Sequence, residues 1–139
     1  MIVLDTNVLS ETLRDAPAPQ VRRWLEAQPR LLLYSTAITE AELLYGVERL
    51  SHGRRRRALA AGIAVILDET LAGRILPFDS SAARMFAEIV AGRQRAGRPI
   101  SHADAQIAAI ARANGADLAT RNIDDFILCG IALIDPWRR

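Results

Sequence analysis

The chain has 139 residues, half of them hydrophobic, and this length fits one globular domain that spans residues 1–139. Its formal net charge is +2, and all 18 of its basic residues are arginine because the sequence contains no lysine. The absence of lysine excludes a Walker A motif, a Schiff-base mechanism and a phosphatase with a catalytic lysine. Any catalysis must therefore use carboxylates, hydroxyls, arginines or the two histidines.

The start of the chain, MIVL at residues 1–4, has no basic segment before its apolar run. No apolar stretch approaches the roughly 20 residues that a membrane span requires. We therefore expect a soluble, cytoplasmic protein with no membrane segment. The single cysteine, Cys129, has no partner for an internal disulfide, and we expect it to be a small buried side chain.

Short apolar runs alternate with longer amphipathic segments along the chain. In chain order the pattern predicts a strand at 2–4, helices at 8–14 and 19–27, a strand at 31–34, helices at 38–50 and 55–72, a strand at 75–78, helices at 81–96 and 102–114, a strand at 118–119, a short helix after Asn122 and a strand at 131–134. Gly97, Gly115 and Gly130 are expected to end helices. Strands that alternate with helices predict an α/β fold, in which a parallel sheet has helices on both faces.

Asp5 directly follows the first predicted strand. In open parallel sheets, the carboxyl ends of the strands and the N-termini of the following helices meet at one edge, where ligands bind. Asp5 is therefore a candidate functional residue. It is also a good N-cap for the next helix, because a carboxylate accepts hydrogen bonds from the free amides of the first turn.

Glu42 and Asp104 each stand three residues after a hydroxyl residue, Thr39 and Ser101 respectively. This spacing is typical of the capping box at a helix N-terminus, and capping is the first interpretation of each acid. The face of the helix on which each acid lies favours a further role, because a capping acid has no need to lie beside the buried side.

At about 100° per residue, Glu42 lies near Ile38 and Tyr45 on the expected buried side, whereas Glu40 points towards solvent. By the same geometry, Asp104 borders an apolar stripe formed by Ala103, Ile107, Ile110 and Ala111.

Asp5, Glu42 and Asp104 would repel one another at a shared edge of the sheet, and burying each carboxylate without a partner costs several kcal/mol. A divalent cation would offset both costs. Ligands that are all oxygen favour hard ions, so the expected metal is Mg²⁺ or Mn²⁺ rather than zinc. Capping and metal binding are compatible, because the positive end of a helix stabilises an ionised acid.

A further helix start follows the strand predicted at 118–119. Asn122 is its expected N-cap and Asp125 is the capping partner three residues later. As functional groups, Asp125 would complete the acidic cluster, and Asn122 would hold a metal-bound water or a phosphate oxygen. The residues alone leave both interpretations open.

Taken together, these motifs resemble the PIN-domain ribonucleases and, within them, VapC-type toxins of the FitB-like branch. The resemblance covers essentially the whole chain, and the ordered set is far more specific than any one motif. Its segments are Asp5-Thr6-Asn7, Thr39-Glu40-Ala41-Glu42-Leu43 with Gly46, Ser101-His102-Ala103-Asp104, Thr120-Arg121-Asn122 with Asp125-Phe126, and the stretches 72–79 and 135–137.

The resemblance implies a single three-layer α/β/α PIN domain that acts as a Mg²⁺- or Mn²⁺-dependent endoribonuclease, the toxin of a VapBC-type toxin-antitoxin system. It also implies an RNA substrate, a VapB-type antitoxin as partner and a homodimer. By position, Asp5, Glu42 and Asp104 correspond to the family's acidic metal ligands, and Thr6 to its hydroxyl beside the first aspartate. The fourth acid of the FitB-like pattern can stand where this chain has Asn122, so either Asp125 substitutes for it or three carboxylates suffice.

Two other functions use the same acids. A PIN-like module that binds RNA or a protein partner without cutting predicts RNA affinity and no metal-dependent turnover. A phosphatase or phosphotransferase with Asp5 as nucleophile is disfavoured by the missing lysine and by the neutral side chain of Asn7.

Some other residues have candidate roles in binding or packing. The arginine run at 54–57 either contacts RNA phosphates or forms a solvated helix start. His102 is expected at the surface and Trp24 in the core or a subunit interface, while core packing is the favoured role of Tyr45.

Overall fold

Five short strands form a central parallel sheet in the computed structural model, which describes residues 1–138. They lie side by side in the order β3-β2-β1-β4-β5, and every neighbouring pair is parallel, which confirms the predicted α/β class. The strands are β1 (Ile2–Leu4), β2 (Leu33–Thr36), β3 (Ile75–Leu76), β4 (Asp117–Ala119) and β5 (Leu133–Ile134).

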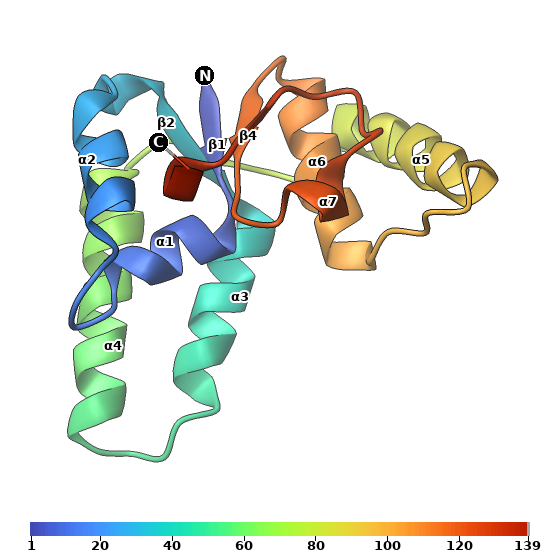
Figure 1. Ribbon diagram of the computed structural model, residues 1–139. Coiled ribbons are helices and arrows are strands. Elements are labelled where there is room, and N and C mark those ends of the chain that lie inside the picture. Colours follow the sequence, from blue (N-terminus) through green and yellow to red (C-terminus); the bar gives the residue numbers. More distant parts are fainter. Residues whose placement is uncertain (139) are drawn as a thin grey trace.

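Helices connect these strands (Figure 1). Asp5, Thr36, Asp79 and Ser101 each begin one of them by accepting a hydrogen bond from a backbone amide of its first turn. The helices are α1 (Thr6–Thr12), α2 (Pro19–Ala27), α3 (Ala37–Glu48), α4 (Arg54–Val65), α5 (Ser80–Arg95), α6 (His102–Ala113) and α7 (Ile123–Phe126), with short 3-10 turns at Arg30–Leu32 and Pro136–Arg138.

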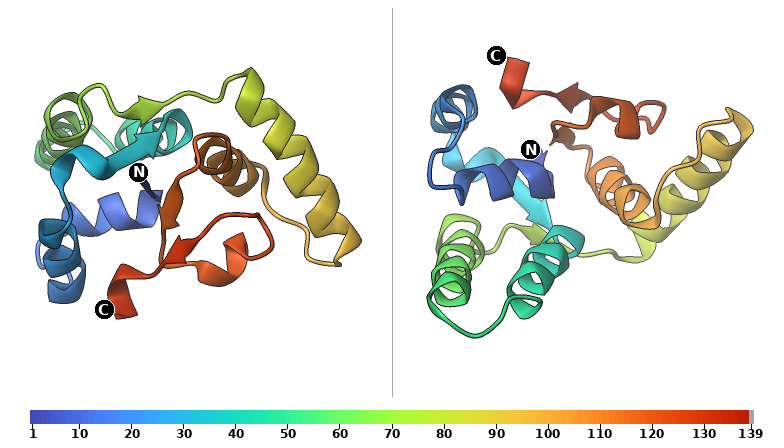
Figure 2. Two further views of the ribbon diagram at one scale, coloured as in Figure 1. Left: turned by 90° about the horizontal axis from the view of Figure 1, so that it is seen from above. Right: turned by 60° about the horizontal axis from the view of Figure 1, so that its bottom comes forward.

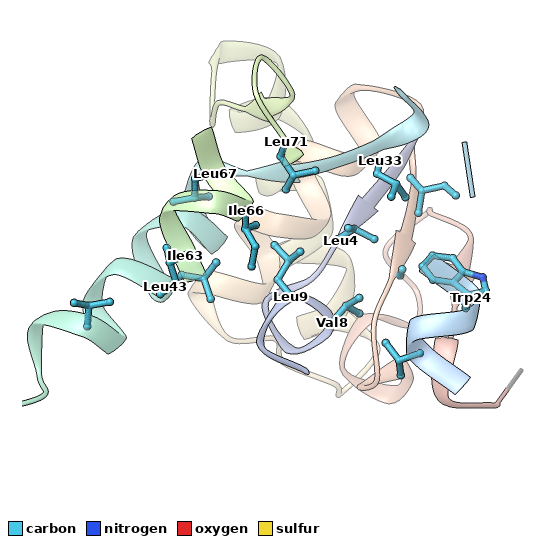
Figure 3. Packing of buried hydrophobic residues seen from close by; sticks show 14 residues of the cluster. Leu4, Val8, Leu9, Trp24, Leu33, Leu43, Ile63, Ile66, Leu67 and Leu71 are labelled. Carbon is cyan, nitrogen blue, oxygen red and sulfur yellow. The ribbon is translucent and has the colours of Figure 1, made fainter. Parts of the chain in front are cut away.

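The central strand β1 is buried on both faces, because successive side chains of a strand point to opposite sides. Ile2 and Leu4 join a hydrophobic cluster with residues of α1, α2 and α4, which Figure 3 shows from close by. Val3 joins a second cluster under α5 and α6. Figure 2 shows these two groups of helices on opposite sides of the sheet. The predicted three-layer α/β/α architecture is confirmed.

The order of the strands reverses at β1, since β2 and β3 lie on one side of it and β4 and β5 on the other. Such a reversal opens a crevice at the carboxyl ends of the two diverging strands, here β1 and β4. Asp5 and Thr120 directly follow these strands, and the Asp5 amide donates to the carbonyl of Ala119 at 2.9 Å. The fold thus places Asp5 where sheets of this kind bind ligands.

The predicted start of the second strand is wrong. β2 begins at Leu33, because Leu31 and Leu32 form an exposed 3-10 turn in which their side chains are 74% and 43% exposed. The run of three leucines has the composition of a buried strand, and only the third of them reaches the core.

The helix predicted over 55–72 is divided in two. α4 ends at Val65, and one π-helical turn follows at Ile66–Thr70. Its wider spacing appears in the hydrogen bond from the Leu71 amide to the Ile66 carbonyl, at 2.8 Å. Gly97 and Gly115 do end α5 and α6 with positive φ, whereas Gly130 lies in the turn before β5.

α3 buries a different side from the one its pattern predicts. Leu43 and Val47 are buried, whereas Tyr45 is 67% exposed and Glu40 is half-buried rather than solvated. Apolar residues occur all around this helix, so their positions do not identify the face that α1 and α4 cover.

Three other burial predictions are confirmed. Trp24 and Cys129 lie in the two hydrophobic clusters, and His102 is exposed. Within residues 1–138, no helix has both the length and the apolar character needed to cross a membrane.

Candidate active site

Asp5 is buried at the end of β1, where its carboxylate accepts hydrogen bonds on both oxygens. Oδ1 accepts from the Thr6 amide at 2.8 Å, so Asp5 caps α1 as predicted. Oδ2 accepts from the Thr120 hydroxyl at 2.7 Å and from the Asn7 side-chain amide at 3.2 Å. The carboxylate is therefore held rigidly, although only neutral groups hold it.

The pKa of Asp5 is raised from 3.8 to about 6, chiefly because burial disfavours the charged form. The hydrogen bonds from Thr120 and Thr6 oppose the shift, and the nearby charges of Asp104 and Glu42 increase it. The charges of Asp104 and Glu42 thus act on Asp5, and a cation placed among the three carboxylates would be stabilised by all of them.

Thr120 and Asn7 form the support for Asp5. The buried Thr120 hydroxyl also accepts from the Asn122 amide at 3.0 Å, and Asn7 Oδ1 accepts from the Arg121 amide at 3.2 Å. Neither residue is assigned to the site from the sequence alone, although both lie within the motifs that resemble the PIN domain. Thr120 directly follows β4 and Asn7 stands two residues after Asp5, and these positions are what could have indicated their role.

Thr6 joins Asp5 to Glu42. Its Oγ1 lies 2.7 Å from Glu42 Oε1 and 3.0 Å from the Thr39 hydroxyl. An ionised carboxylate has no proton to donate, so the single hydroxyl proton of Thr6 goes to Glu42, and Thr39 donates to Thr6. This contact fixes an otherwise exposed Glu42 beside Asp5.

The predicted capping box at Thr39 and Glu42 is wrong. Thr36 begins α3 instead, since its hydroxyl accepts from the Thr39 amide at 3.1 Å. Glu42 therefore lies in the second turn, beyond the reach of the free amides at the helix start. Its contact with Thr6 leaves it available for the site.

Asp104 lies in the first turn of α6, and Ser101 caps this helix as predicted, with its hydroxyl 3.2 Å from the Asp104 amide. Partial burial raises the pKa of the Asp104 carboxyl, as do the charges of Asp125 and Glu42, whereas Ser101 and Arg93 oppose the shift. The charges of both Glu42 and Asp125 thus act on Asp104.

The fourth position is divided between Asn122 and Asp125. Asn122 occupies the N-cap position of α7, but its side chain makes no capping hydrogen bond, so the predicted capping by its side chain is wrong. Its backbone amide donates to Thr120 instead. Asp125 is exposed, and its charge acts on Asp104.

The donors around this crevice suit a hard divalent cation, because they are carboxylate and hydroxyl oxygens. In the described part of the chain, no three acidic, histidine or cysteine side chains converge closely enough to enclose a metal ion by themselves. Mg²⁺ ordinarily binds one or two carboxylates and keeps several waters. The separation of Asp5, Glu42 and Asp104 fits that mode of binding rather than an all-protein cage.

A groove of about 960 Å³ opens beside Glu42, between α1, α3 and α4. Thr6 and Glu42 line it next to the site, and the guanidinium-bearing residues Arg14, Arg49 and Arg55 line it further along. Asp15 is the other acid of its lining. Arginines beside an acidic crevice are a suitable surface for a phosphate backbone.

A three-layer α/β/α fold with acids gathered where β1 and β4 diverge is the architecture of a PIN domain. The family model of the PIN domain matches residues 2–128, and the chain belongs to this family, as its motifs predicted.

Similarity to individual relatives extends over nearly the whole chain. The chain is 42% identical over 137 residues to the VapC ribonuclease Y4jK of Sinorhizobium fredii, covering 99% of this chain and 98% of the relative. It is 39% identical to the toxin FitB of Neisseria gonorrhoeae, covering 99% of each. The solved structure of FitAB bound to a DNA fragment is similar with a TM-score of 0.93 and 38% identity, covering 99% of this chain and 96% of that one.

Proposed function

We infer that this chain is an endoribonuclease that acts as the toxin of a VapBC-type toxin-antitoxin system, the class to which the names of its relatives belong. The observation that carries the enzymatic part is the buried Asp5 carboxylate with Asp104 and Glu42 beside it. A module that only binds RNA or protein has no need of this cluster, because a buried carboxylate with two other acids nearby destabilises a fold. The cluster therefore favours the enzyme over the non-catalytic module.

We propose that Asp5 and Asp104 hold Mg²⁺ or Mn²⁺, with Glu42 as the third acidic group. The pKa values of Asp5 and Asp104 are raised chiefly by burial and further by neighbouring carboxylates, and a bound cation would relieve both effects. The all-oxygen donor set also supports this assignment. A bound cation of this kind lowers the pKa of water and neutralises charge that develops on a scissile phosphodiester.

The side chains of the site supply positioning. Thr120, Asn7 and the Thr6 amide keep Asp5 in one orientation. Glu42 is fixed through Oε1, while Oε2 accepts no hydrogen bond from the described residues and is free to orient an attacking water. The arginines of the groove would bind RNA phosphates on the approach to the crevice.

We further propose that the toxin pairs with a VapB-type antitoxin and forms a homodimer, as the family resemblance implies. Support for the partner comes from the relatives: FitB is named a toxin, and FitAB is a solved complex with DNA.

The proposed activity is tested with purified protein free of antitoxin and a labelled RNA in Mg²⁺. Asp5→Asn and Asp104→Asn should each abolish cleavage while the far-UV circular dichroism spectrum stays that of the wild type. Asp68→Asn is the matched control, since Asp68 is an exposed acid on the π-helical turn after α4. This variant should cleave RNA at the wild-type rate. Cleavage by either site variant at the wild-type rate would refute the assignment.

A further inference from the structure

Arg93 is a buried cation whose charge opposes the raised pKa of Asp104. It lies in the last turn of α5 and is only 4% exposed. A buried charge usually has an oppositely charged partner. Within residues 1–138, however, no carboxylate forms a salt bridge with Arg93.

Two hydrogen bonds of Arg93 are directed to the backbone around the end of α7. Nη1 donates to the carbonyl of Asp125 at 2.9 Å and to that of Ile127 at 2.8 Å, and lies 3.8 Å from Cys129 Sγ. Nε donates to the Arg98 carbonyl at 2.5 Å, which ties the guanidinium to the loop after α5. One side chain thus fixes the residues on both sides of Leu128.

Leu128 is the only non-glycine residue with positive φ in the described part of the chain, at 63°. A leucine pays an energetic cost in this left-handed conformation and keeps it only where surrounding contacts impose it. Its side chain is 64% exposed, so burial of Leu128 does not explain the conformation. The contacts of Arg93 with Ile127 and Cys129 on either side do.

α7 is a short helix of four residues that starts without a side-chain cap. Its own hydrogen bonds therefore provide little rigidity. It nevertheless carries Asp125, whose charge acts on Asp104, and Arg93 binds the backbone carbonyl of that same residue. The carbonyl that Arg93 binds and the carboxylate that acts on Asp104 thus belong to the same residue, Asp125.

We propose that Arg93 is a positioning residue, which holds the strained turn after α7 so that the Asp125 carboxylate reaches the cation bound at Asp104. In this arrangement Asp125 substitutes for the fourth acid, whose position in this chain is occupied by Asn122. The proposal rests on the metal site of the proposed function, and it concerns a residue that does not touch the metal or the RNA.

The test is calorimetric titration of Mn²⁺ into the RNA-free protein, with wild type, Arg93→Lys, Asp125→Asn and the double variant. Lysine keeps the charge but cannot donate to both carbonyls from one planar group. We expect each single variant to weaken Mn²⁺ binding roughly tenfold, the lower end of what supporting residues of metal sites contribute. The double variant should bind no more weakly than Asp125→Asn, because Arg93 acts through Asp125.

Arg95→Lys is the matched control, since Arg95 is an exposed arginine in the same last turn of α5, and the Mn²⁺ affinity of this variant should equal that of the wild type. Wild-type affinity in Arg93→Lys or in Asp125→Asn, or losses that multiply in the double variant, would overturn the proposal. If the wild type bound Mn²⁺ and Asp5→Asn did not, the metal site itself would stand whatever the Arg93 variants did.

A measurement on the unmodified protein makes the test independent of how Arg93→Lys folds. Bound Mn²⁺ broadens NMR signals of nuclei near it, so the backbone amides of Asp124 and Asp125 should broaden together with those of Asp5 and Asp104. Sharp signals from α7 at a Mn²⁺ level that broadens Asp5 would also overturn the proposal.

Discussion

Asp5 is the residue where activity and stability oppose each other. Its pKa is about 6 in the folded protein and about 3.9 in an unfolded chain, so the folded state binds this proton more tightly. Its contribution to the stability of the metal-free protein is therefore full below pH 4 and is lost as pH rises to about 6. The loss amounts to as much as about 3 kcal/mol. Denaturant unfolding in EDTA at a series of pH values measures it.

Asp5→Asn isolates this contribution, because asparagine does not titrate. The difference in unfolding free energy between the variant and the wild type should grow in favour of the variant from pH 4 to pH 6 and then level off. Added Mg²⁺ at pH 7 should stabilise the wild type and leave the variant unchanged. Parallel pH curves for the two proteins would show that the Asp5 carboxyl is not perturbed.

Thr6 controls the position of Glu42 through one hydroxyl. Thr6→Val keeps the shape of the side chain but removes the donor. A hydrogen bond to a charged group contributes about 1.5–3 kcal/mol, so we expect kcat for RNA cleavage to fall roughly tenfold or more. Thr6→Ser should retain most of the activity. Steady-state kinetics of the two variants test this role of Thr6. Equal kcat values for Thr6→Val and the wild type would show that Thr6 does not contribute to catalysis.

At the scale of single elements, the caps of α1 and α6 were predictable from the sequence, whereas that of α7 was not. Asp5 and Ser101 cap as expected, because a cap needs only one side chain and amides within three residues. α3 offers two hydroxyls, Thr36 and Thr39, and the end of β2 selects the first. A local pattern contains no information about where the preceding strand ends.

Residues that act over long sequence separations could not be found in this way. Thr120 meets Asp5 across 115 positions, and Arg93 meets Asp125 across 32. No periodicity or spacing rule connects such pairs, because the sheet topology and helix packing bring them together. The acids themselves were predictable, because the ordered set of motifs that contains them resembles the PIN domain.

The arginine run that begins α4 divides between the two roles expected for it. Arg56 binds Glu48 at 3.1 Å and the carbonyl of Leu50 at 3.0 Å, which ties α4 to the end of α3. Arg55 instead lines the groove together with Arg49. One member of the run is therefore structural, and another is free to contact RNA.

The groove predicts a specific pattern of binding defects. Arg49→Glu with Arg55→Glu should raise KM for RNA roughly tenfold at low salt and leave kcat nearly unchanged, because lost phosphate contacts weaken binding rather than chemistry. The slope of log affinity against log salt should also become shallower. Arg22→Glu with Arg23→Glu, on exposed positions of α2, is the charge-matched control. An equal effect of both pairs would mean that only net charge matters.

At the scale of the whole molecule, the reversal of strand order at β1 assembles the site. It brings Asp5 after β1 and Thr120 after β4 to one edge, with α3 and α6 supplying Glu42 and Asp104. We propose that residues 1–139 fold as a single domain, because the two hydrophobic clusters meet at β1 and neither is complete without it.

The central claim is that this crevice cuts RNA with a divalent metal. The most direct measurement follows cleavage of a labelled RNA by the wild-type protein, freed of antitoxin, first in EDTA and then after Mg²⁺ or Mn²⁺ is returned in excess. The account predicts no cleavage in EDTA and full recovery with either ion. Cleavage that continues in EDTA would contradict it.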